Sequence, residues 1–120
     1  MTQEFEAQHY NNLGLDALLE NNFEVALENF NKALKIDPTL VGVIYNRANL
    51  CSILRSSEQA IADYNLAIEI QPEYYEAYVN RGIVYLEQKQ DAHAAIADFT
   101  KAIEIDPAQV QAYFNPCECL

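Results

Sequence analysis

The sequence has few residues of the kinds that interrupt regular structure. Its 120 residues include three glycines, four prolines and no tryptophan, and no Gly-rich or Ser-rich tract has the composition of a linker. With 51% apolar residues, a chain of this length can bury one core of ordinary size. We therefore expect one ordered domain over residues 1–120.

Basic residues are also scarce. The chain has seven Lys and Arg residues but 18 Asp and Glu residues. The resulting net charge of −11 repels phosphate and anionic lipid. The longest apolar run, residues 40–45, is far shorter than the roughly 20 residues of a membrane span. The first six residues carry no cation, unlike a targeting segment. We predict a cytoplasmic protein without nucleic-acid or membrane partners, whose acidic surface serves solubility or suits a neutral to basic protein segment.

Residues that perform chemistry are isolated. Three cysteines, Cys51, Cys117 and Cys119, lack the spacing of a disulfide framework, which is typical of a reducing compartment. Cys51 falls inside an apolar helical pattern and is expected in the core. His9 and His93 have no Cys or carboxylate at ligand spacing, and phosphate loops and nucleophile motifs are lacking. We predict no metal site, no cofactor and no enzymatic activity.

What the sequence does contain is an internal repeat. Two apolar residues separated by one position recur shortly before Pro38, Pro72 and Pro107. These prolines are 34 and then 35 residues apart. Upstream of each proline, a small residue is followed four positions later by an aromatic residue, and three positions after that by another small residue. These spacings keep all three on one helical face. These residues are Ala26, Phe30 and Ala33; Ala60, Tyr64 and Ala67; and Ala95, Phe99 and Ala102. The pattern predicts one amphipathic helix per unit.

A second helix is predicted upstream in each unit, with Gly14, Ala48 and Gly82 at matching positions. Glycine inside a helix lowers stability by up to about 1 kcal/mol relative to alanine. Its recurrence at matching positions therefore indicates that two helices cross closely there. Turns are predicted at residues 20–22, 55–57 and 88–91.

Each turn contains a residue able to cap the helix that follows, namely Asn21, Ser56 or Asp91. Ser56 with Gln59 has the form of a capping box. The extra residue of the third unit falls in its turn, where neither helical face is changed.

These features resemble the tetratricopeptide repeat, over residues 7–115. The sequence departs from the usual pattern at Ala17, Ile44, Ala48, Cys51 and at Arg47 and Arg81, where leucine is usual. The resemblance implies an all-α, right-handed solenoid of antiparallel helix pairs, with first helices on the concave wall and second helices on the convex wall. The implied repeats are residues 7–40, 41–74 and 75–109, with a partial fourth at 110–115 and an irregular tail at 116–120.

Asparagine occupies the same position in every first helix, at Asn12, Asn46, Asn80 and Asn115. The resemblance implies that this position faces the concave groove, where a row of asparagines grips the backbone of an extended peptide through the donor and the acceptor of each carboxamide. The alternative, a hydrogen bond to a neighbouring helix, stays open. The other residues implied on this wall are Leu15, Tyr45, Asn49, Val79, Ile83 and Phe114. We predict a protein-protein interaction module, or adaptor.

Another binding mode of the family holds the acidic tail of heat-shock chaperones with three cations and two asparagines on the first helices. Only Asn46 matches that set, and the remaining positions hold Asn11, Leu15, Glu76 and Asn80. These residues supply none of the cations that a terminal carboxylate requires. We therefore do not expect this chain to bind chaperone tails.

The C-terminal part indicates an alternative role. Pro116 interrupts the partial fourth unit, so no polar capping helix is predicted to cover the apolar face around Ala102 and Ile103. An open apolar end is typical of a piece of a longer array, or of a scaffold that associates with itself to form a homo-oligomer.

Overall fold

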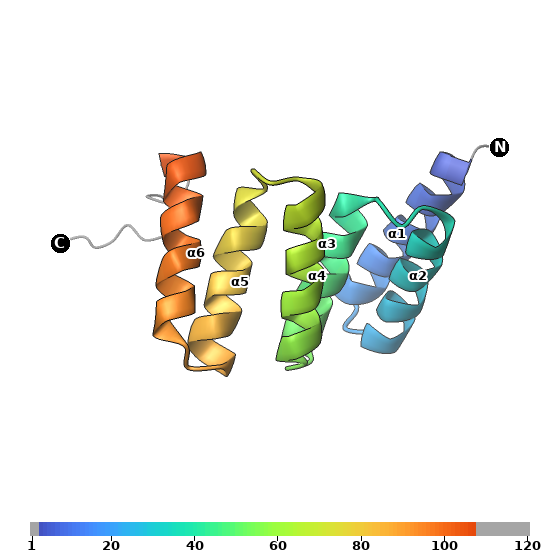
Figure 1. Cartoon of the computed structure of the whole chain (residues 1–120). Helices are drawn as coiled ribbons and strands as arrows, with labels where there is room; N and C mark the ends of the chain where they lie inside the picture. The colour runs from blue at the N-terminus through green and yellow to red at the C-terminus, as the bar shows by residue number, and fades with distance from the viewer. Residues whose placement is uncertain (1–2, 108–120) are drawn as a thin grey trace.

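The structure, a computed structural model, describes residues 3–107 and contains six α-helices and no strand within that range. The helices are α1 (Gln3–Leu19), α2 (Phe23–Ile36), α3 (Val41–Ile53), α4 (Ser57–Ile70), α5 (Tyr75–Gln88) and α6 (Ala92–Ile105). They form antiparallel pairs stacked in a row (Figure 1), which confirms the predicted all-α solenoid. The predicted unit at residues 110–115 and the tail at 116–120 lie outside the described range.

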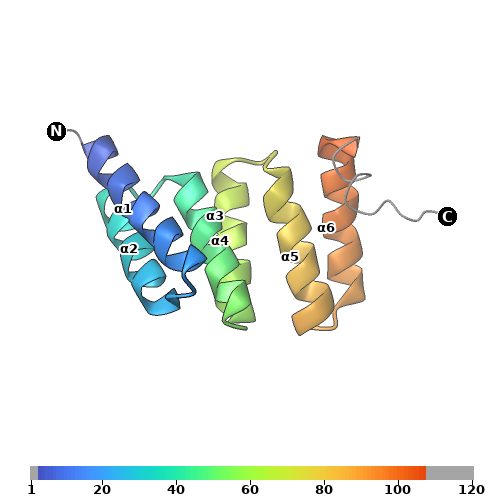
Figure 2. The same ribbon diagram turned by 180° about the vertical axis from the view of Figure 1, so that it is seen from behind.

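The first and second helices of the pairs form two layers. Helices α2 and α4 lie in front of α1 and α3 in Figure 1 and behind them in Figure 2. Along the first layer, α1 approaches α3 and α3 approaches α5 to within 8 Å between Cα atoms, whereas no such approach occurs among the described second helices α2, α4 and α6. The first helices therefore form a continuous wall, and the second helices stand farther apart.

Each pair is held by an aromatic ring that lies against a glycine or alanine of the first helix. A Cβ added at Gly14 would stand 2.5 Å from Cε1 of Phe30, and one added at Gly82 would stand 2.7 Å from Cε1 of Phe99. In the middle pair, Ala48 and Tyr64 are both buried in one core cluster. The close helix crossing predicted from the repeated small residues is confirmed.

The turn residues differ from the prediction by one position in the first pair. Asn22, and not Asn21, is the N-cap of α2, and its side chain accepts a hydrogen bond from the Val25 amide at 3.5 Å. Asn21 has instead a φ of 60°, in the left-handed region. Arg55 and Gln90 have similar values, 64° and 51°, at matching places in the other turns. The tight turn needs this conformation directly before the cap, and asparagine adopts it readily.

The caps of the later pairs also differ from each other. The Asp91 side chain accepts from the Ala94 amide at 3.1 Å, so the predicted cap of α6 is confirmed. Ser56 occupies the N-cap position of α4 but its side chain makes no capping bond, and the predicted capping box with Gln59 is wrong. Gln59 instead lines a groove on the second-helix side. Over the described residues, no helix is both long and apolar enough to traverse a bilayer.

The helix crossings predict opposite effects for alanine at different glycines. Gly14→Ala and Gly82→Ala should each lower the free energy of unfolding by about 1–2 kcal/mol, because overpacking against a buried ring outweighs the gain in helix propensity. Urea unfolding measures this. The matched control is Gly42→Ala on α3, where an added Cβ has no neighbour within 4 Å. Its stability should be unchanged or higher, and equal losses at Gly42 and Gly82 would contradict the crossing.

Candidate functional site

Side chains at matching positions of the first helices form one face, which we call the first-helix face. Spacings of three and four residues place them on one side of each helix. They are Gln8, Asn12, Leu15 and Leu19 on α1; Gly42, Asn46, Asn49 and Ile53 on α3; and Glu76, Asn80, Ile83 and Glu87 on α5. All twelve are at least partly exposed, so this face is accessible along the whole described wall.

Six of the predicted wall residues belong to the first-helix face, namely Asn12, Leu15, Asn46, Asn49, Asn80 and Ile83. Tyr45 is half-buried beside them. Val79 is a correction, because its side chain is 1% exposed and packs in a cluster with Tyr78 and Ala102. It occupies the position of Tyr45, but the shorter valine stays beneath the surface. Phe114 and Asn115 lie outside the described residues.

The asparagines of α3 and α5 join successive first helices. Asn46 Nδ2 donates to Asn11 Oδ1 on α1 at 3.1 Å. Asn80 Nδ2 donates to the Tyr45 hydroxyl at 2.8 Å and to Asn49 Oδ1 at 3.0 Å, both on α3. The structure thus contains the inter-helix bond that the sequence left open as an alternative. Both Nδ2 hydrogens of Asn80 are used, and its Oδ1 remains as an acceptor.

An aromatic cluster lies under this row. The Tyr45 ring packs against Tyr64 and Tyr74, with ring centroids 6.1 Å and 5.0 Å away. The Tyr64 hydroxyl hydrogen-bonds Asn49 Oδ1, and burial raises the pKa of Tyr64 well above its ordinary range. Burial likewise raises the pKa of Tyr74 to about 12. The cluster thus places the Tyr64 hydroxyl where it holds the Asn49 carboxamide.

A cavity opens on the first-helix face between α3 and α5. It has a volume of about 210 Å³, and its lining residues are Asn49, Ser52, Ile53, Tyr64, Asn80 and Ile83. The rim is therefore both polar, at the two carboxamides, and apolar, at the two isoleucines. Gln88 Nε2 donates to the Ser52 carbonyl at 3.1 Å, while its Oε1 is buried without a hydrogen-bond partner.

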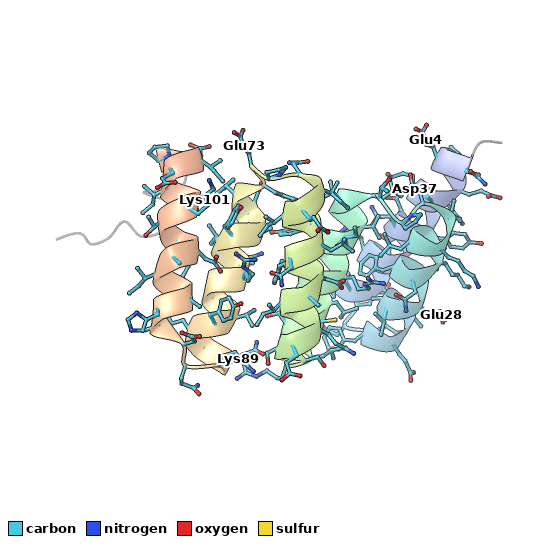
Figure 3. The ribbon with its side chains drawn as sticks, viewed as in Figure 1. Glu4, Glu28, Asp37, Glu73, Lys89 and Lys101 are labelled. Carbon is cyan, nitrogen blue, oxygen red and sulfur yellow. The ribbon has the colours of Figure 1, made fainter. Side chains whose placement is uncertain are left out.

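The first-helix face has an uneven charge. Its two charged side chains, Glu76 and Glu87, both lie on α5, and none of its twelve residues is a Lys or Arg. The charged side chains labelled in Figure 3, among them Glu28, Glu73 and Lys101, lie at the outside of the helix stack. A ligand on this face would therefore meet neutral carboxamides along α1 and α3 and a negative potential near α5.

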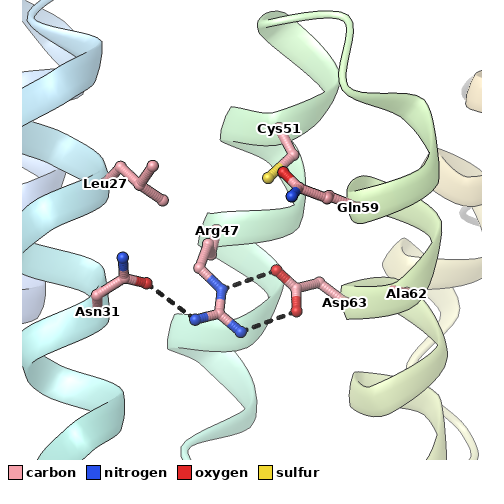
Figure 4. Close-up of a pocket in the computed structure, with 7 residues that line it drawn as sticks. All are labelled: Leu27, Asn31, Arg47, Cys51, Gln59, Ala62 and Asp63. Carbon is pink, nitrogen blue, oxygen red and sulfur yellow. Dashed lines mark hydrogen bonds and ion pairs between the residues drawn. The ribbon is translucent and has the colours of Figure 1, made fainter.

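Sequence reasoning missed a second constellation, on the opposite side of α3. The Arg47 guanidinium donates through Nε and Nη2 to both carboxylate oxygens of Asp63 on α4, at 2.8 Å and 2.9 Å. Its Nη1 donates to Asn31 Oδ1 on α2 at 2.9 Å (Figure 4). We call this set the arginine clamp, because one side chain joins three helices. The bond to Asp63 raises the pKa of Arg47.

The same clamp recurs one repeat later. Arg81 donates to both oxygens of Asp98, at 2.9 Å and 2.6 Å, and to Asn65 Oδ1 at 2.5 Å. The bond to Asp98 raises the pKa of Arg81. The sequence signal was present: arginine replaces the usual leucine twice, 34 residues apart, and the asparagine recurs after 34 residues and the aspartate after 35. Only the folded chain brings them together.

The remaining candidates for chemistry stay apart. Among the described residues, no group of three or more His, Cys, Asp or Glu is arranged to hold a metal ion. The His9 ring packs beside Tyr10 with centroids 5.4 Å apart, and His93 is exposed. Cys51 is buried as predicted, and burial raises the pKa of its thiol, which keeps it in the less reactive protonated form.

Comparison with known protein families identifies the repeat. Models of the tetratricopeptide repeat match residues 10–40 and 75–109, and a model described as TPR repeat matches residues 56–89. The chain is a tetratricopeptide repeat protein. The matches at 10–40 and 75–109 fall on the first and third helix pairs, and the match at 56–89 spans α4 and α5, which belong to successive pairs.

Curated relatives of this tetratricopeptide repeat protein are longer than the chain. A FAM10 family protein from Arabidopsis thaliana is 33% identical over an alignment of 85 residues that covers 66% of this chain and 19% of that protein. Small glutamine-rich tetratricopeptide repeat-containing protein 2 from Saccharomyces cerevisiae is 31% identical over 81 residues, which are 68% of this chain and 23% of that protein. The chain thus spans about a fifth of their length.

A solved structure shares the fold of this tetratricopeptide repeat protein. The first TPR of Spaghetti (RPAP3), bound to the HSP90 peptide SRMEEVD, superposes with a TM-score of 0.82 at 21% identity. The superposition covers 92% of this chain and 94% of that one.

The two arginine clamps predict measurable coupling. In double-mutant cycles with Arg→Leu and Asp→Ala, each pair should give a coupling energy of about 1–3 kcal/mol, because the single aspartate variant leaves a desolvated guanidinium unpaired. Arg81–Asp98, with side chains 18% and 6% exposed, should exceed Arg47–Asp63, at 26% and 12%.

The matched control for these cycles is Lys32–Glu28, an exposed pair with a spacing of four residues on α2. Its coupling should not exceed about 0.5 kcal/mol. Urea unfolding at constant salt gives all three values. Equal coupling in the clamps and in the exposed pair would contradict a structural role for the clamps.

Proposed function

We propose that this chain is a protein-interaction module whose first-helix face binds an extended, neutral to basic segment of a partner protein. Membership of the tetratricopeptide repeat family supports the interaction role. The observation that carries the proposal is the cavity between α3 and α5, because it places an apolar space beside the carboxamides of Asn49 and Asn80. A peptide needs both: a space for a side chain and a partner for its backbone.

The hydrogen bonds within the asparagine row define what each residue offers a ligand. Asn80 offers its Oδ1, an acceptor for a backbone N–H, since both of its Nδ2 hydrogens are used. Asn46 offers its Oδ1 and one Nδ2 hydrogen. Asn12, which accepts from Gln8 at 3.0 Å, offers Nδ2 as a donor. The row therefore contains donors and acceptors in a fixed order, and the peptide direction is selected by that order.

The repeat spacing suits an extended ligand. Packed helices lie roughly 8–10 Å apart, a distance that about three residues of extended chain span at roughly 3.3 Å each. One peptide residue in three would meet the asparagine row, and the intervening side chains would reach the cavity or the exposed side chain of Ile53.

Charge defines which peptides fit. The Spaghetti domain was solved with the peptide SRMEEVD, which shows that this fold accommodates a peptide in that protein. On the first-helix face of the present chain, Glu76 and Glu87 would repel such acidic residues, and no cation of that face attracts them. A segment that carries Lys or Arg near α5 is favoured instead.

A peptide selected from a random phage-displayed library against the full chain tests this proposal. In titration calorimetry, Asn46→Ala/Asn80→Ala should weaken its binding at least about tenfold, which is about 1.4 kcal/mol. Because these asparagines also bond within the protein, Ile53→Asp serves as a second variant that breaks no hydrogen bond and should weaken binding as strongly.

The matched control is Ile96→Asp on the outer surface of α6, which should leave the affinity unchanged. Glu76→Gln/Glu87→Gln should weaken a lysine-containing peptide and leave its norleucine analogue unaffected. Undiminished affinity in both the asparagine variant and Ile53→Asp would refute binding on the first-helix face.

A second candidate function, self-association, is favoured by the outer face of α6. Ile96 and Ile103 are 61% and 47% exposed. Their counterparts in α4, Ile61 and Ile68, are half-buried, packed into clusters that include α5 residues. Ala102, predicted to be part of this open face, is fully buried and points inward instead. A second copy could cover the two isoleucines.

Light scattering across a concentration series tests self-association. If α6 carries it, the apparent mass should rise with concentration, and Ile96→Lys/Ile103→Lys should return it to the monomer because a charge cannot enter the apolar contact. The control Leu19→Lys, an exposed apolar residue on α1, should leave the mass unchanged. A monomer at every concentration would refute this candidate.

A further inference from the structure

A second hollow lies on the opposite side of α3, in the space between α2 and α4 that we call the α2–α4 groove. Two adjoining cavities of about 300 Å³ and 330 Å³ occupy it and share Asn31 and Arg47. Its floor is α3, with Ile44 and Cys51 on either side of Arg47. No Cα of α2 lies within 8 Å of a Cα of α4, which leaves room for the two cavities between these helices.

Most of the polar groups that the clamp leaves free in this groove are hydrogen-bond donors, and Gln59 adds a carboxamide with both a donor and an acceptor. The clamp uses three of the five N–H groups of Arg47 and both carboxylate oxygens of Asp63. It also uses Asn31 Oδ1, so that Nδ2 is the free atom of that carboxamide. Lys35 adds an exposed ammonium group to the lining. Since Asp63 is neutralised by Arg47, the lining has an excess of one positive charge in a chain of net charge −11.

The walls of the groove between these donors are apolar. Leu27 and Leu34 of α2 face Ala62 and Leu66 of α4 across the two cavities. Leu66 remains partly exposed. Each cavity has room for more than one aliphatic side chain, so the groove combines apolar space with a positive, donor-rich centre.

The equivalent groove between α4 and α6 provides an internal comparison. Tyr78 and Tyr85 occupy the positions of Ile44 and Cys51 there, and Glu69 stands in place of Lys35. The Tyr78 ring lies 5.4 Å from the Arg81 guanidinium and covers it. The clamp of Arg81 is therefore packed against an aromatic ring, whereas that of Arg47 borders two cavities.

We propose that the α2–α4 groove binds an apolar peptide segment of a partner protein that carries a carboxylate. The carboxylate would lie between Lys35 and the free N–H groups of Arg47, which favour an anion over a cation. Its neighbouring apolar side chains would fill the two cavities. This site is distinct from the first-helix face in position and opposite to it in charge preference, and neither depends on the other.

The test uses the full chain and two synthetic peptides, acetyl-Leu-Glu-Leu-Glu-Leu-amide and its Gln-for-Glu analogue. Two-dimensional NMR should show saturable shifts of the Asn31 side-chain amide and the Arg47 Nε–H, with the Glu peptide binding at least about fivefold tighter than the Gln peptide, or about 1 kcal/mol. Equal affinity of the two peptides, or shifts confined to the first-helix face, would overturn the proposal.

Variants that copy the α4–α6 groove locate the site. Lys35→Glu should remove the preference for the Glu peptide, and Cys51→Tyr should abolish the shifts of Asn31 by filling the cavity. The control Lys101→Glu makes the same charge change on α6 (Figure 3) and should leave binding unchanged. If Cys51→Tyr does not fold, Lys35→Glu, at an exposed position, still decides.

Two further results would count against the proposal. Equal effects of Lys35→Glu and Lys101→Glu would show a response to net charge rather than to the groove. A protein mass that rises with concentration and falls on Lys35→Glu would make the occupant a second copy of this chain and not a partner peptide.

Discussion

The close approach of two helices at an aromatic ring is the constraint on which the rest of the structure depends. Phe30 and Phe99 lie so near Gly14 and Gly82 that a β-carbon would collide with the ring. This contact fixes the depth and the rotation of each helix pair, and it thereby decides which residues of the first helix turn inward. Everything on the two outer sides of the first helices follows from that rotation. The asparagine row lies on one side of the first helices, and Arg47 and Arg81 lie on the other.

Polar bridges then join one pair to the next on both sides of the first helices. Asn46 and Asn80 bond to the preceding first helix, while Arg47 and Arg81 bond to the second helices before and after them. A buried ion pair contributes little net stability, since desolvation opposes the Coulomb attraction, but its geometry is demanding. The bridges therefore mainly fix how successive repeats align, and apolar contacts supply most of the free energy that stabilises the fold. Leu13, in the arginine position of α1, makes no such bridge and is exposed.

The fold was predictable because a period of 34 or 35 residues repeats the same packing code, and each copy confirms the others. The turns were predicted to within one residue, since no sequence rule identifies Asn21 rather than Asn22 as the left-handed residue. Val79 was misplaced because its position lies at the edge of the wall, where side-chain length decides exposure. The clamp escaped prediction for another reason: Arg47 and Asp63 lie 16 residues apart on two helices, and only their packing reveals that they meet.

Helix α3 explains why the departures from the family pattern are concentrated where they are. Among the described helices, it is the first-type helix with a helix pair on each side, so its residues meet neighbours in every direction. Arg47 holds the clamp, Ala48 meets the ring of Tyr64, and Ile44 and Cys51 leave space that tyrosines fill in α5. If these substitutions only preserved the core, larger residues would serve better, as Tyr78 and Tyr85 do. Their smaller size instead leaves cavities beside Arg47, whereas the Tyr78 ring lies over Arg81 at the matching place one repeat later.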